Sequence, residues 1–506
     1  MRKHLKQAGA PALSVALTCF FPCAFLFFRN AGEARAADML PFFGIFLLTA
    51  AAIFLPLALI LRNVSRAALV TDLAMPVVIY CTAVCRAVKE LLPWFRDLMF
   101  LIPAAALLLA LTAVLARKKP NMTVLCGLIA VMYAAMLAVS AAPAVPTLIS
   151  AASYEKSDVQ TDPALTVQTF SGEKRNFYYL IFDEYGGPEN LLHYYDYDNQ
   201  EFWDGLEERG FAVSQTSKNT ESAWTVSIIP NMLNLQYVTG DDVPITSRLE
   251  WLEQPAIYEL FRNNGYRINL VNHDSFLGES GCRVLTQRQA EETISVYLYE
   301  NSIFCVIPGL KWVIEDHVLH RGQNGPRLAL DNARDAMLSC WEAAREGPTL
   351  TICYLSAPHA PFLFDRTGRG THPAEYYDWR RPELYLAKLE YITPAILETV
   401  DNIQRQDPEA VIVLQADHGA RMPGQLVYYY GGPWFDTQAE IPYMENVLNA
   451  VYVPGGAPDI EGDSCINTLR RTINAVYGTD MAMLDVPPDY EIPAEYMPPE
   501  PEASNE

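Results

Sequence analysis

Long apolar segments dominate the first 150 residues of the chain. Five of them are each close to the twenty residues that a membrane-spanning helix needs, and they cover roughly 10–28, 39–61, 67–86, 98–116 and 121–142. Because four further spans follow the first, that first segment is not a cleaved signal peptide. Asp72 and Pro76 make the third segment the weakest of the set. The pattern predicts a transmembrane five-helix anchor over 1–142, with a soluble helical domain as the alternative.

The charged residues between these segments predict the orientation of the helices. Loops on one side carry basic residues without an acidic partner, namely Arg2, Lys3, Lys6, Arg62, Arg66, Arg117, Lys118 and Lys119. On the other side the basic residues are offset by Glu33, Asp38, Glu90 and Asp97. Since an excess of Lys and Arg marks cytoplasmic loops, we expect a cytoplasmic amino terminus. An odd number of spans then predicts a multi-pass protein of the plasma (inner) membrane whose remaining chain is extracytoplasmic.

The pattern changes after the last span. Residues 143–170 contain Pro143, Pro146 and Pro163 and indicate a juxtamembrane linker with some interfacial helix. Between 171 and 485, strand-like runs near 176–182, 267–272, 349–355, 411–415 and 448–453 alternate with helical patterns near 199–209, 255–264, 284–300, 328–345 and 383–405. This alternation predicts an α/β domain around a largely parallel sheet. The acidic, proline-rich tail 486–506 cannot bury a core, and we expect it to be disordered.

The distribution of charged residues also changes near the end of the last predicted span. Residues 1–150 contain thirteen Lys and Arg against five Asp and Glu, whereas the rest contains twenty-four against fifty-four. The acidic second part argues against nucleic-acid binding, which needs a positive surface. The ten cysteines have no zinc-ligand spacing and support no disulfide framework.

Two predicted strands, more than 200 residues apart, end in acidic residues. Asp183 and Glu184 close the first strand of the second part, and Asp417 and His418 follow the apolar run 411–414. In a parallel sheet both ends open onto the same edge, where α/β proteins build their sites. Carboxylates and an imidazole together suit Mn²⁺, Zn²⁺ or Mg²⁺. A polar loop with a hydrogen-bonded histidine, and a helix cap at Asp183, remain the alternatives.

Two further stretches carry candidate chemistry. His359 lies between Pro358 and Pro361 after an apolar strand, where its imidazole can bind a phosphate oxygen, protonate a leaving group or be a buried structural histidine. Elsewhere, four hydroxyls precede a short helical pattern whose first turn suits Pro230; they belong to Thr220, Ser222, Thr225 and Ser227. A hydroxyl ahead of a helix amino terminus favours a phosphorylated or sulfated intermediate, although each of the four, taken singly, is more often a helix cap than a nucleophile.

Taken together, these residues resemble the alkaline phosphatase/sulfatase superfamily. The arrangement is most similar to its membrane-anchored branch, which includes lipoteichoic acid synthase and lipid phosphoethanolamine transferases. The resemblance covers roughly 175–475, and the five-span anchor extends it. It implies an alkaline-phosphatase-like three-layer α/β/α sandwich behind a five-helix transmembrane bundle.

The resemblance also implies roles for particular residues. Asp417 and His418 match the late D-H-G metal motif, Asp183 matches the first-strand ligand, and Glu184 falls where sulfatases have a second acidic ligand. His359 matches the histidine that contacts the transferred group. The nucleophile falls on Thr225, which is also a metal ligand. Thr225 is stiff at its first torsion and so is easily aimed, whereas we expect Ser227 to cap the helix.

One departure from the family pattern bears on the reaction. No C-x-P-x-R segment, whose cysteine sulfatases oxidise to formylglycine, occurs in the chain. We therefore expect a metal-dependent enzyme that transfers or hydrolyses a phosphoglycerol- or phosphoethanolamine-type group through a covalent phosphothreonine. The resemblance implies Mn, Zn, Mg or Ca as the divalent metal, with Mn or Zn favoured, and a lipid or envelope polymer as substrate. The alternatives are a sulfatase-type hydrolase without formylglycine and a non-catalytic polyanion-binding membrane domain.

Overall fold

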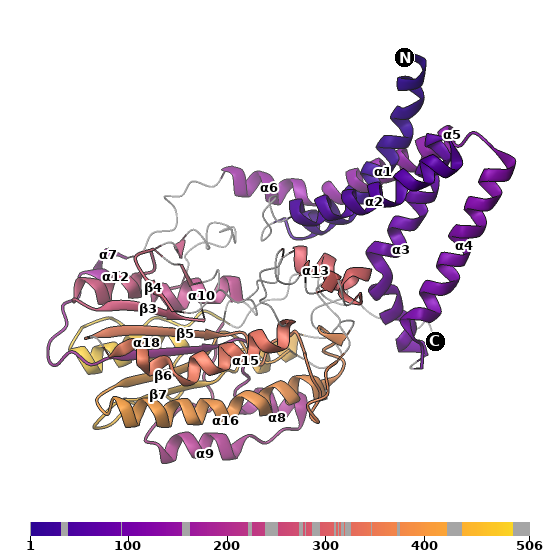
Figure 1. Cartoon of the computed structure of the whole chain (residues 1–506). Helices are drawn as coiled ribbons and strands as arrows, with labels where there is room; N and C mark the ends of the chain where they lie inside the picture. Colours follow the sequence, from indigo (N-terminus) through magenta and orange to yellow (C-terminus); the bar gives the residue numbers. More distant parts are fainter. Residues whose placement is uncertain are drawn as a thin grey trace, which may run out of the picture. The chain divides into compact units, whose positions relative to one another are not determined.

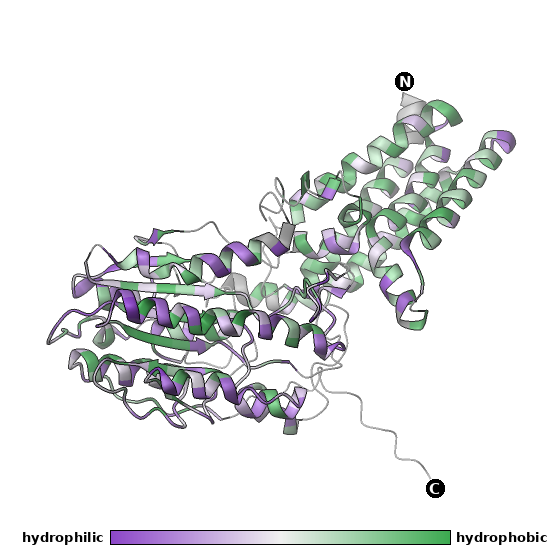
Figure 2. Cartoon of the chain, turned by 60° about the horizontal axis from the view of Figure 1, so that its bottom comes forward, coloured by the Kyte–Doolittle hydropathy of each residue, from purple (hydrophilic) through white to green (hydrophobic). Residues whose placement is uncertain are grey.

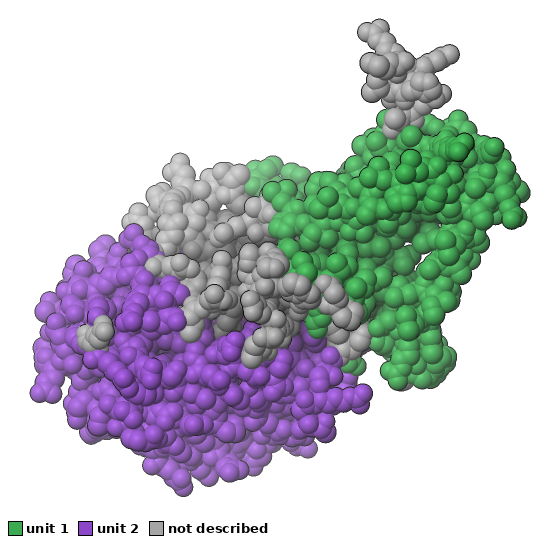
Figure 3. All heavy atoms as spheres, viewed as in Figure 1, with its two compact units in different colours: residues 1–154, 290–325, 373–375 green, residues 155–289, 326–372, 376–506 purple. Residues whose placement is uncertain are grey.

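The chain was analysed as a computed structural model. It describes residues 2–31, 39–92, 94–153, 162–220, 225–237, 251–252, 254–272, 277–278, 280–285, 294–307, 310–311, 313–314, 318, 325–345, 347–371, 375–421 and 438–488. The chain forms two compact units (Figure 3). The first comprises Met1–Tyr154, Ala290–Gly325 and Pro373–Glu375, and the second comprises Glu155–Gln289, Pro326–His372 and Tyr376–Glu506.

The first unit is built on long apolar helices. These are α1 (Arg2–Arg29), α2 (Leu40–Leu61), α3 (Val64–Leu91), α4 (Asp97–Lys118) and α5 (Thr123–Ala141), and a shorter helix, α6 (Ala144–Ser153), follows them. In the described part of the chain, five helices are long and apolar enough to cross a membrane, which confirms the five predicted segments. Figure 2 shows that hydrophobic residues, coloured green, predominate in these helices. Leu98, Leu107 and Leu109 of α4 are exposed, as expected for a helix that faces lipid.

A segment from the middle of the sequence also belongs to the first unit. It contains α13 (Ile294–Asn301) and η4 (Ile303–Cys305), which contact α3. The sequence predicted a helix over 284–300 within the α/β domain. The structure has the helix at 294–301 and among the membrane helices, while residues 286–293 lie outside the described part.

The second unit contains a sheet with seven described strands in the order β2-β7-β6-β1-β5-β3-β4. Their bounds are β1 (Phe177–Phe182), β2 (Ala212–Val213), β3 (Arg267–Val271), β4 (Arg283–Val284), β5 (Thr349–Leu355), β6 (Val411–Ala416) and β7 (Asn449–Tyr452). β1 pairs in parallel with β5 and β6, and β7 runs antiparallel to β6. The sheet is therefore mixed but largely parallel, as predicted. β2 and β4 have two residues each, too few for an apolar pattern to reveal them.

Helices cover both faces of this sheet (Figure 1). One face carries α8 (Pro188–Tyr195), α9 (Gln200–Glu208), α15 (Gly325–Leu338) and α16 (Pro382–Gln406), and the other carries α10 (Thr225–Asn234), α12 (Ala256–Asn263) and α18 (Cys465–Tyr477). Shorter elements are α7 (Pro163–Thr166), η5 (Cys340–Ala344), η7 (Gln438–Glu440) and α17 (Ile441–Met444). The three layers confirm the expected α/β/α sandwich. α8 and α18 were not predicted from the sequence.

Burial on both faces explains the continuous apolar run of β1, the central strand. Phe177 packs against Phe261 of α12, with ring centroids 5.3 Å apart. The next residue points to the opposite face, where the Tyr178 hydroxyl donates a 3.2 Å hydrogen bond to Asp407 Oδ2 beyond the end of α16. Every residue of β1 is buried. Such strands read as uninterrupted apolar runs because no side faces water.

The register of the central strands positions the candidate site. Phe182, the last residue of β1, lies opposite Leu355 of β5 and Ala416 of β6. The residues that follow are Asp183 and Asp417, which therefore leave the sheet at one level. This confirms that the two acidic strand ends open onto the same edge.

Candidate metal centre and its surroundings

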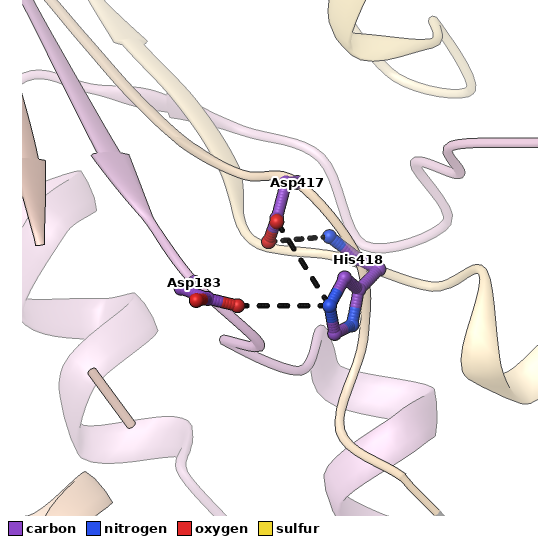
Figure 4. Close-up of side chains that lie close together, drawn as sticks. All are labelled: Asp183, Asp417 and His418. Carbon is purple, nitrogen blue, oxygen red and sulfur yellow. Dashed lines mark hydrogen bonds and ion pairs between the residues drawn. The ribbon is translucent and has the colours of Figure 1, made fainter. Parts of the chain in front are cut away.

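Three side chains converge at the carboxyl edge of the sheet (Figure 4). Asp183, Asp417 and His418 each offer one ligand atom, and these atoms lie within 4.8 Å of one another. His418 Nε2 is 3.6 Å from Asp183 Oδ1 and 3.8 Å from Asp417 Oδ2. All three residues are buried. The structure thus brings together three of the predicted ligands from strand ends that are distant in sequence.

The atoms that converge at this centre lack hydrogen-bond partners. Asp183 Oδ1, Asp417 Oδ2 and His418 Nε2 are buried and make no hydrogen bond of normal geometry. His418 Nδ1 lies 2.9 Å from the Gly419 carbonyl oxygen. Because a carbonyl only accepts, Nδ1 is a donor, and in the Nδ1–H tautomer Nε2 presents its lone pair toward the two carboxylates. Three acceptors facing one another are unfavourable without a cation, so this donor set fits a divalent metal ion.

The remaining carboxylate oxygens are held by hydrogen bonds that orient the two aspartates. Asp183 Oδ2 accepts a 2.8 Å bond from the Tyr354 hydroxyl. Asp417 Oδ1 accepts bonds from the backbone N–H groups of Glu184, at 3.1 Å, and His418, at 2.8 Å. Partners of this kind fix ligand orientation around protein metal sites.

The two carboxyl groups differ in acidity. Burial raises the pKa of Asp183, but the neighbouring His359 and His418 and the Tyr354 hydrogen bond together lower it below its usual value. Burial raises the pKa of Asp417, and the charge of Asp183 adds to this rise despite the opposing effect of His418. A cation between the two groups would stabilise the ionised form of Asp417.

Thr225 is the first residue of α10, and its side chain reaches the centre. Its hydroxyl is close enough to the Asp417 carboxylate to lower the pKa of that group as a hydrogen-bond donor. The predicted helix start was wrong, because Pro230 lies inside α10 rather than in its first turn. Ser227 is consequently buried within the helix and is not its cap. Ser222 lies outside the described residues.

Thr220 shares one property with the candidate metal ligands. It is 3% exposed, and its Oγ1 atom has no hydrogen-bond partner. Among the three candidate hydroxyls that the structure describes, an interaction with Asp417 is found for Thr225.

His359 lies beside the three ligands rather than among them. Its Nδ1 atom is 2.7 Å from the Ala360 carbonyl oxygen, which identifies Nδ1 as a donor. The same atom is 4.0 Å from Asp183 Oδ2, and Nε2 is 3.8 Å from Glu184 Oε2. These contacts fit the predicted position on the substrate side, although the role of His359 stays a prediction.

A buried lysine that the sequence analysis missed supports this loop. Lys388 of α16 is 2% exposed, and its Nζ atom donates to the Ser356 carbonyl at 2.9 Å and to the His359 carbonyl. Its spacing offered a signal, since Leu384, Lys388 and Ile392 follow one another at four-residue intervals on the buried face of the helix. A cation at such a position requires buried partners.

Glu184 has different surroundings from the three converging ligands. Its Oε1 atom accepts hydrogen bonds from Trp379 Nε1, at 3.1 Å, and from the Arg421 backbone N–H, at 2.9 Å. Its Oε2 atom accepts one from Arg421 Nη1 at 3.1 Å. The backbone turns sharply here, with a left-handed φ of 65° at Glu184. Metal ligation by Glu184 stays a prediction. Its Oε2 atom belongs to a buried ion pair with Arg421 that the sequence analysis did not foresee, and its Oε1 atom accepts the two other hydrogen bonds.

Glycine is required at position 419 because the backbone of Met444 lies very close to it. Its N–H donates a 2.9 Å bond to the Met444 carbonyl, and a Cβ atom at this position would lie 2.4 Å from that oxygen. Any larger residue would push apart the loop that carries His418.

The chain is similar to several proteins of known structure. Solved structures with a similar fold include the periplasmic domain of EptC from Escherichia coli, with 11% identity, 64% of this chain and 89% of that chain covered, and a TM-score of 0.39. The lipoteichoic acid synthase LtaP from Listeria monocytogenes has 12% identity, 62% and 76% coverage, and a TM-score of 0.40.

A membrane protein is also among the similar structures. Lipooligosaccharide phosphoethanolamine transferase A (EptA) from Neisseria meningitidis has 12% identity, 91% and 93% coverage, and a TM-score of 0.38. Identities this low do not define a substrate. No curated protein matches the chain.

The family comparison is decisive for classification. The model of the family described as Sulfatase matches residues 175–445, which is more than half of the chain. This region contains β1, β5 and β6 and all the residues of the candidate metal centre. The chain therefore belongs to the sulfatase family.

Proposed function

We propose that the protein is a metal-dependent enzyme that transfers or hydrolyses a phospho-group of phosphoglycerol or phosphoethanolamine type on the cell envelope. One observation carries the proposal. The Thr225 hydroxyl interacts with Asp417 at a centre where three buried acceptor atoms have no partner. A site that only bound a polyanion would have no need of a hydroxyl beside its ligands.

Asp183, Asp417 and His418 would hold the metal, with Thr225 and Glu184 as further candidate ligands. Mn or Zn suits this mixture of carboxylate and imidazole better than Mg or Ca does. A bound cation would lower the pKa of a neighbouring hydroxyl and neutralise charge on a phosphoryl group.

Thr225 and His359 have different roles in the proposed reaction. Thr225 Oγ1 forms a bond to phosphorus while the bond from phosphorus to the leaving alcohol breaks. Thr225 gives its proton to water, the leaving alcohol takes a proton from His359, and water then reprotonates His359. His359, held through its Nδ1–H, contacts the transferred group and delivers the proton. A sugar hydroxyl, a polymer end or water then attacks the phosphothreonine and restores Thr225.

The membrane helices provide the setting for such a substrate. The basic residues favour a cytoplasmic amino terminus and an extracytoplasmic second unit in the plasma membrane. A domain that is tethered to the bilayer meets a lipid donor at a high effective concentration.

Mass spectrometry of the purified protein after incubation with lipid extract tests the proposal. We expect a covalent adduct on Thr225 with the mass of a phosphoglycerol or phosphoethanolamine group. In parallel, turnover is measured on phosphodiester and sulfate ester substrates. Turnover of sulfate esters alone would instead identify a sulfatase that works without formylglycine, and absence of both adduct and turnover would identify a non-catalytic domain.

A further inference from the structure

A short segment from the acidic second part of the sequence is built into the first unit. The chain leaves the second unit after Gln289 and returns to it at Pro326. Between these points lie α13 and η4, residues 294–305, which we call the inserted segment. The chain therefore passes between the two units between α6 and β1, at both ends of this excursion, and again around Pro373–Glu375.

The inserted segment buries large apolar side chains among the membrane helices. Tyr299 is 1% and Phe304 is 5% exposed. The Tyr299 ring lies 6.5 Å from that of Phe42, and the Phe304 ring stacks on Phe46 at 6.3 Å with an interplanar angle of 20°. The same cluster includes Cys19, Cys23, Leu26, Met75 and Ile79 from α1 and α3. Three spanning helices thus contribute to one continuous apolar interface with the segment.

Several polar groups near Ser302 of the segment are satisfied by hydrogen bonds. Thr82 of α3 donates a 3.0 Å hydrogen bond to the Ser302 carbonyl oxygen and lies 3.4 Å from Cys305 Sγ. The Ser302 hydroxyl accepts a bond from the Phe304 N–H and donates one to the Tyr299 carbonyl. Non-helical backbone among membrane helices is tolerated only where such groups are satisfied inside the protein.

The ring contacts of the segment lie toward one end of the bundle. Phe42 and Phe46 are in the first two turns of α2, whereas Cys23 and Leu26 are in the last two turns of α1. A rise of 1.5 Å per residue puts Phe46 about 9 Å along α2 from Leu40. These helix ends are the ones that the charge pattern assigns to the extracytoplasmic side. The segment therefore enters the bundle from the side on which the second unit is expected.

We propose that the inserted segment is a second, non-covalent attachment of the catalytic unit to its own membrane helices. A single linker would leave the catalytic unit free to tumble. Two attachments restrict its orientation, which matters because the donor of the function proposed above is held in the bilayer. Only this last consequence rests on the proposed function, since the attachment itself is independent of any reaction.

Membrane retention tests the attachment directly. A protease site is introduced into the full-length protein between Ser153 and Asp162. Membranes that contain this protein are treated with the protease and then washed at high salt. We expect the fragment that begins near Asp162 to stay with the membranes. In the double variant Tyr299→Asp, Phe304→Asp we expect the same fragment to be released. Leu192→Asp, at a position of α8 that is 58% exposed, is the matched control and should be retained. Release of the unmodified fragment, or retention of the double variant, would overturn the proposal.

A cross-link avoids the possibility that added charge merely unfolds the segment. Thr82→Cys places a thiol beside Cys305, since the Thr82 hydroxyl is 3.4 Å from that sulfur. A mild copper oxidant should then join the two protease fragments by a bond that reducing agent breaks. Adding Cys305→Ser should abolish this product. If no Cys305-dependent product forms, the segment is not seated against α3.

An activity comparison separates this proposal from the proposed function. The charged double variant should lose turnover of a lipid donor in vesicles but keep turnover of a small soluble phosphodiester. Equal loss on both substrates, with the fragment still retained, would contradict the attachment role. Absence of turnover in the unmodified protein would bear on the proposed function, while the retention and cross-link results would still decide the attachment.

Discussion

Arg421 Nη1 donates a 3.1 Å hydrogen bond to Glu184 Oε2, and the side chains of both residues are largely shielded from water. The Arg421 guanidinium also lies over the Trp379 ring, 5.0 Å from its centroid. A buried ion pair of this kind stands directly beside the candidate metal centre, on the residue that follows the ligand Asp183. Its presence allows the two roles considered for Glu184, ion-pair partner and metal ligand, to be separated experimentally.

The Glu184→Gln variant should keep its metal and lose stability. Removing one partner of a buried pair leaves the other charge uncompensated, which costs roughly 3–5 kcal/mol when the partner is deleted. The isosteric amide should cost less than Glu184→Ala. The double variant Glu184→Gln, Arg421→Met should recover part of the loss, because no unpaired charge then remains. Metal analysis and thermal unfolding of the purified protein provide the measurements, and loss of the metal in Glu184→Gln would instead establish ligation.

Asp417→Asn should lose both the metal and the turnover while the domain stays folded. Asp417 supplies one of the three convergent acceptor atoms, and an amide is a much weaker ligand than a carboxylate. Asp204→Asn, on the exposed side of α9, is the matched control and should change neither property. A chelator should lower the melting temperature of the unmodified protein, since a ligand that binds the folded state stabilises it. Unchanged metal content in Asp417→Asn would exclude the site.

How much of this arrangement the sequence predicts depends on the range of the interactions. The ends of β1 and β6 are recognisable because each apolar run stops at a carboxylate, and parallel pairing then aligns Asp183 with Asp417. The partners of Lys388 and Arg421 are not recognisable. Each depends on segments tens to hundreds of residues away, and no local pattern encodes which of them will meet.

Local patterns also fail where a sequence signal is compatible with more than one helix start or more than one packing partner. Pro230 suits a first helical turn, but α10 begins five residues earlier, at Thr225, and accommodates the proline inside. The apolar face of α13 predicts a buried helix without indicating what buries it. The membrane helices, rather than the sheet, cover Val296 and Tyr299.

Lys388→Met should reduce turnover without releasing the metal. The lysine ties the carbonyl groups of Ser356 and His359 to α16, and each buried carbonyl left without a partner costs about 1–3 kcal/mol. The loop that carries His359 should then lose its fixed position. Lys388→Arg should restore part of the turnover, because it keeps the charge and the donors. Arg405→Met, at an exposed position of the same helix, serves as the control. Equal metal loss and turnover loss in Lys388→Met would indicate a general structural defect instead.

A reporter fused after residue 170 should be active only outside the cytoplasm. The five candidate spans and the basic loops on one side both lead to this orientation. A reporter fused after Lys119, in a loop expected to be cytoplasmic, should give the opposite signal. A cytoplasmic signal from the first fusion would mean that one helix does not span, and α3, which contains Asp72 and Pro76, would be the first to examine.

Thr225→Ala should abolish the covalent adduct and reduce turnover by several orders of magnitude, up to about 10⁶-fold, as removal of a nucleophile does in an enzyme that retains its binding groups. The reason is positional, because the Thr225 hydroxyl interacts with the Asp417 carboxylate at the start of α10. Thr225→Ser should keep some activity, since it retains the hydroxyl but loses the stiffness of the branched side chain.

Thr220 is the rival that the structure offers for this role. Its hydroxyl is buried and has no hydrogen-bond partner, so it also stands ready to accept a new contact. Thr220→Val preserves the shape of the side chain and removes only the hydroxyl. We expect this variant to keep the adduct on Thr225 and most of the turnover. An adduct that persists in Thr225→Ala but disappears in Thr220→Val would transfer the nucleophile to Thr220, and it would leave the assignment of Asp183, Asp417 and His418 to the metal intact.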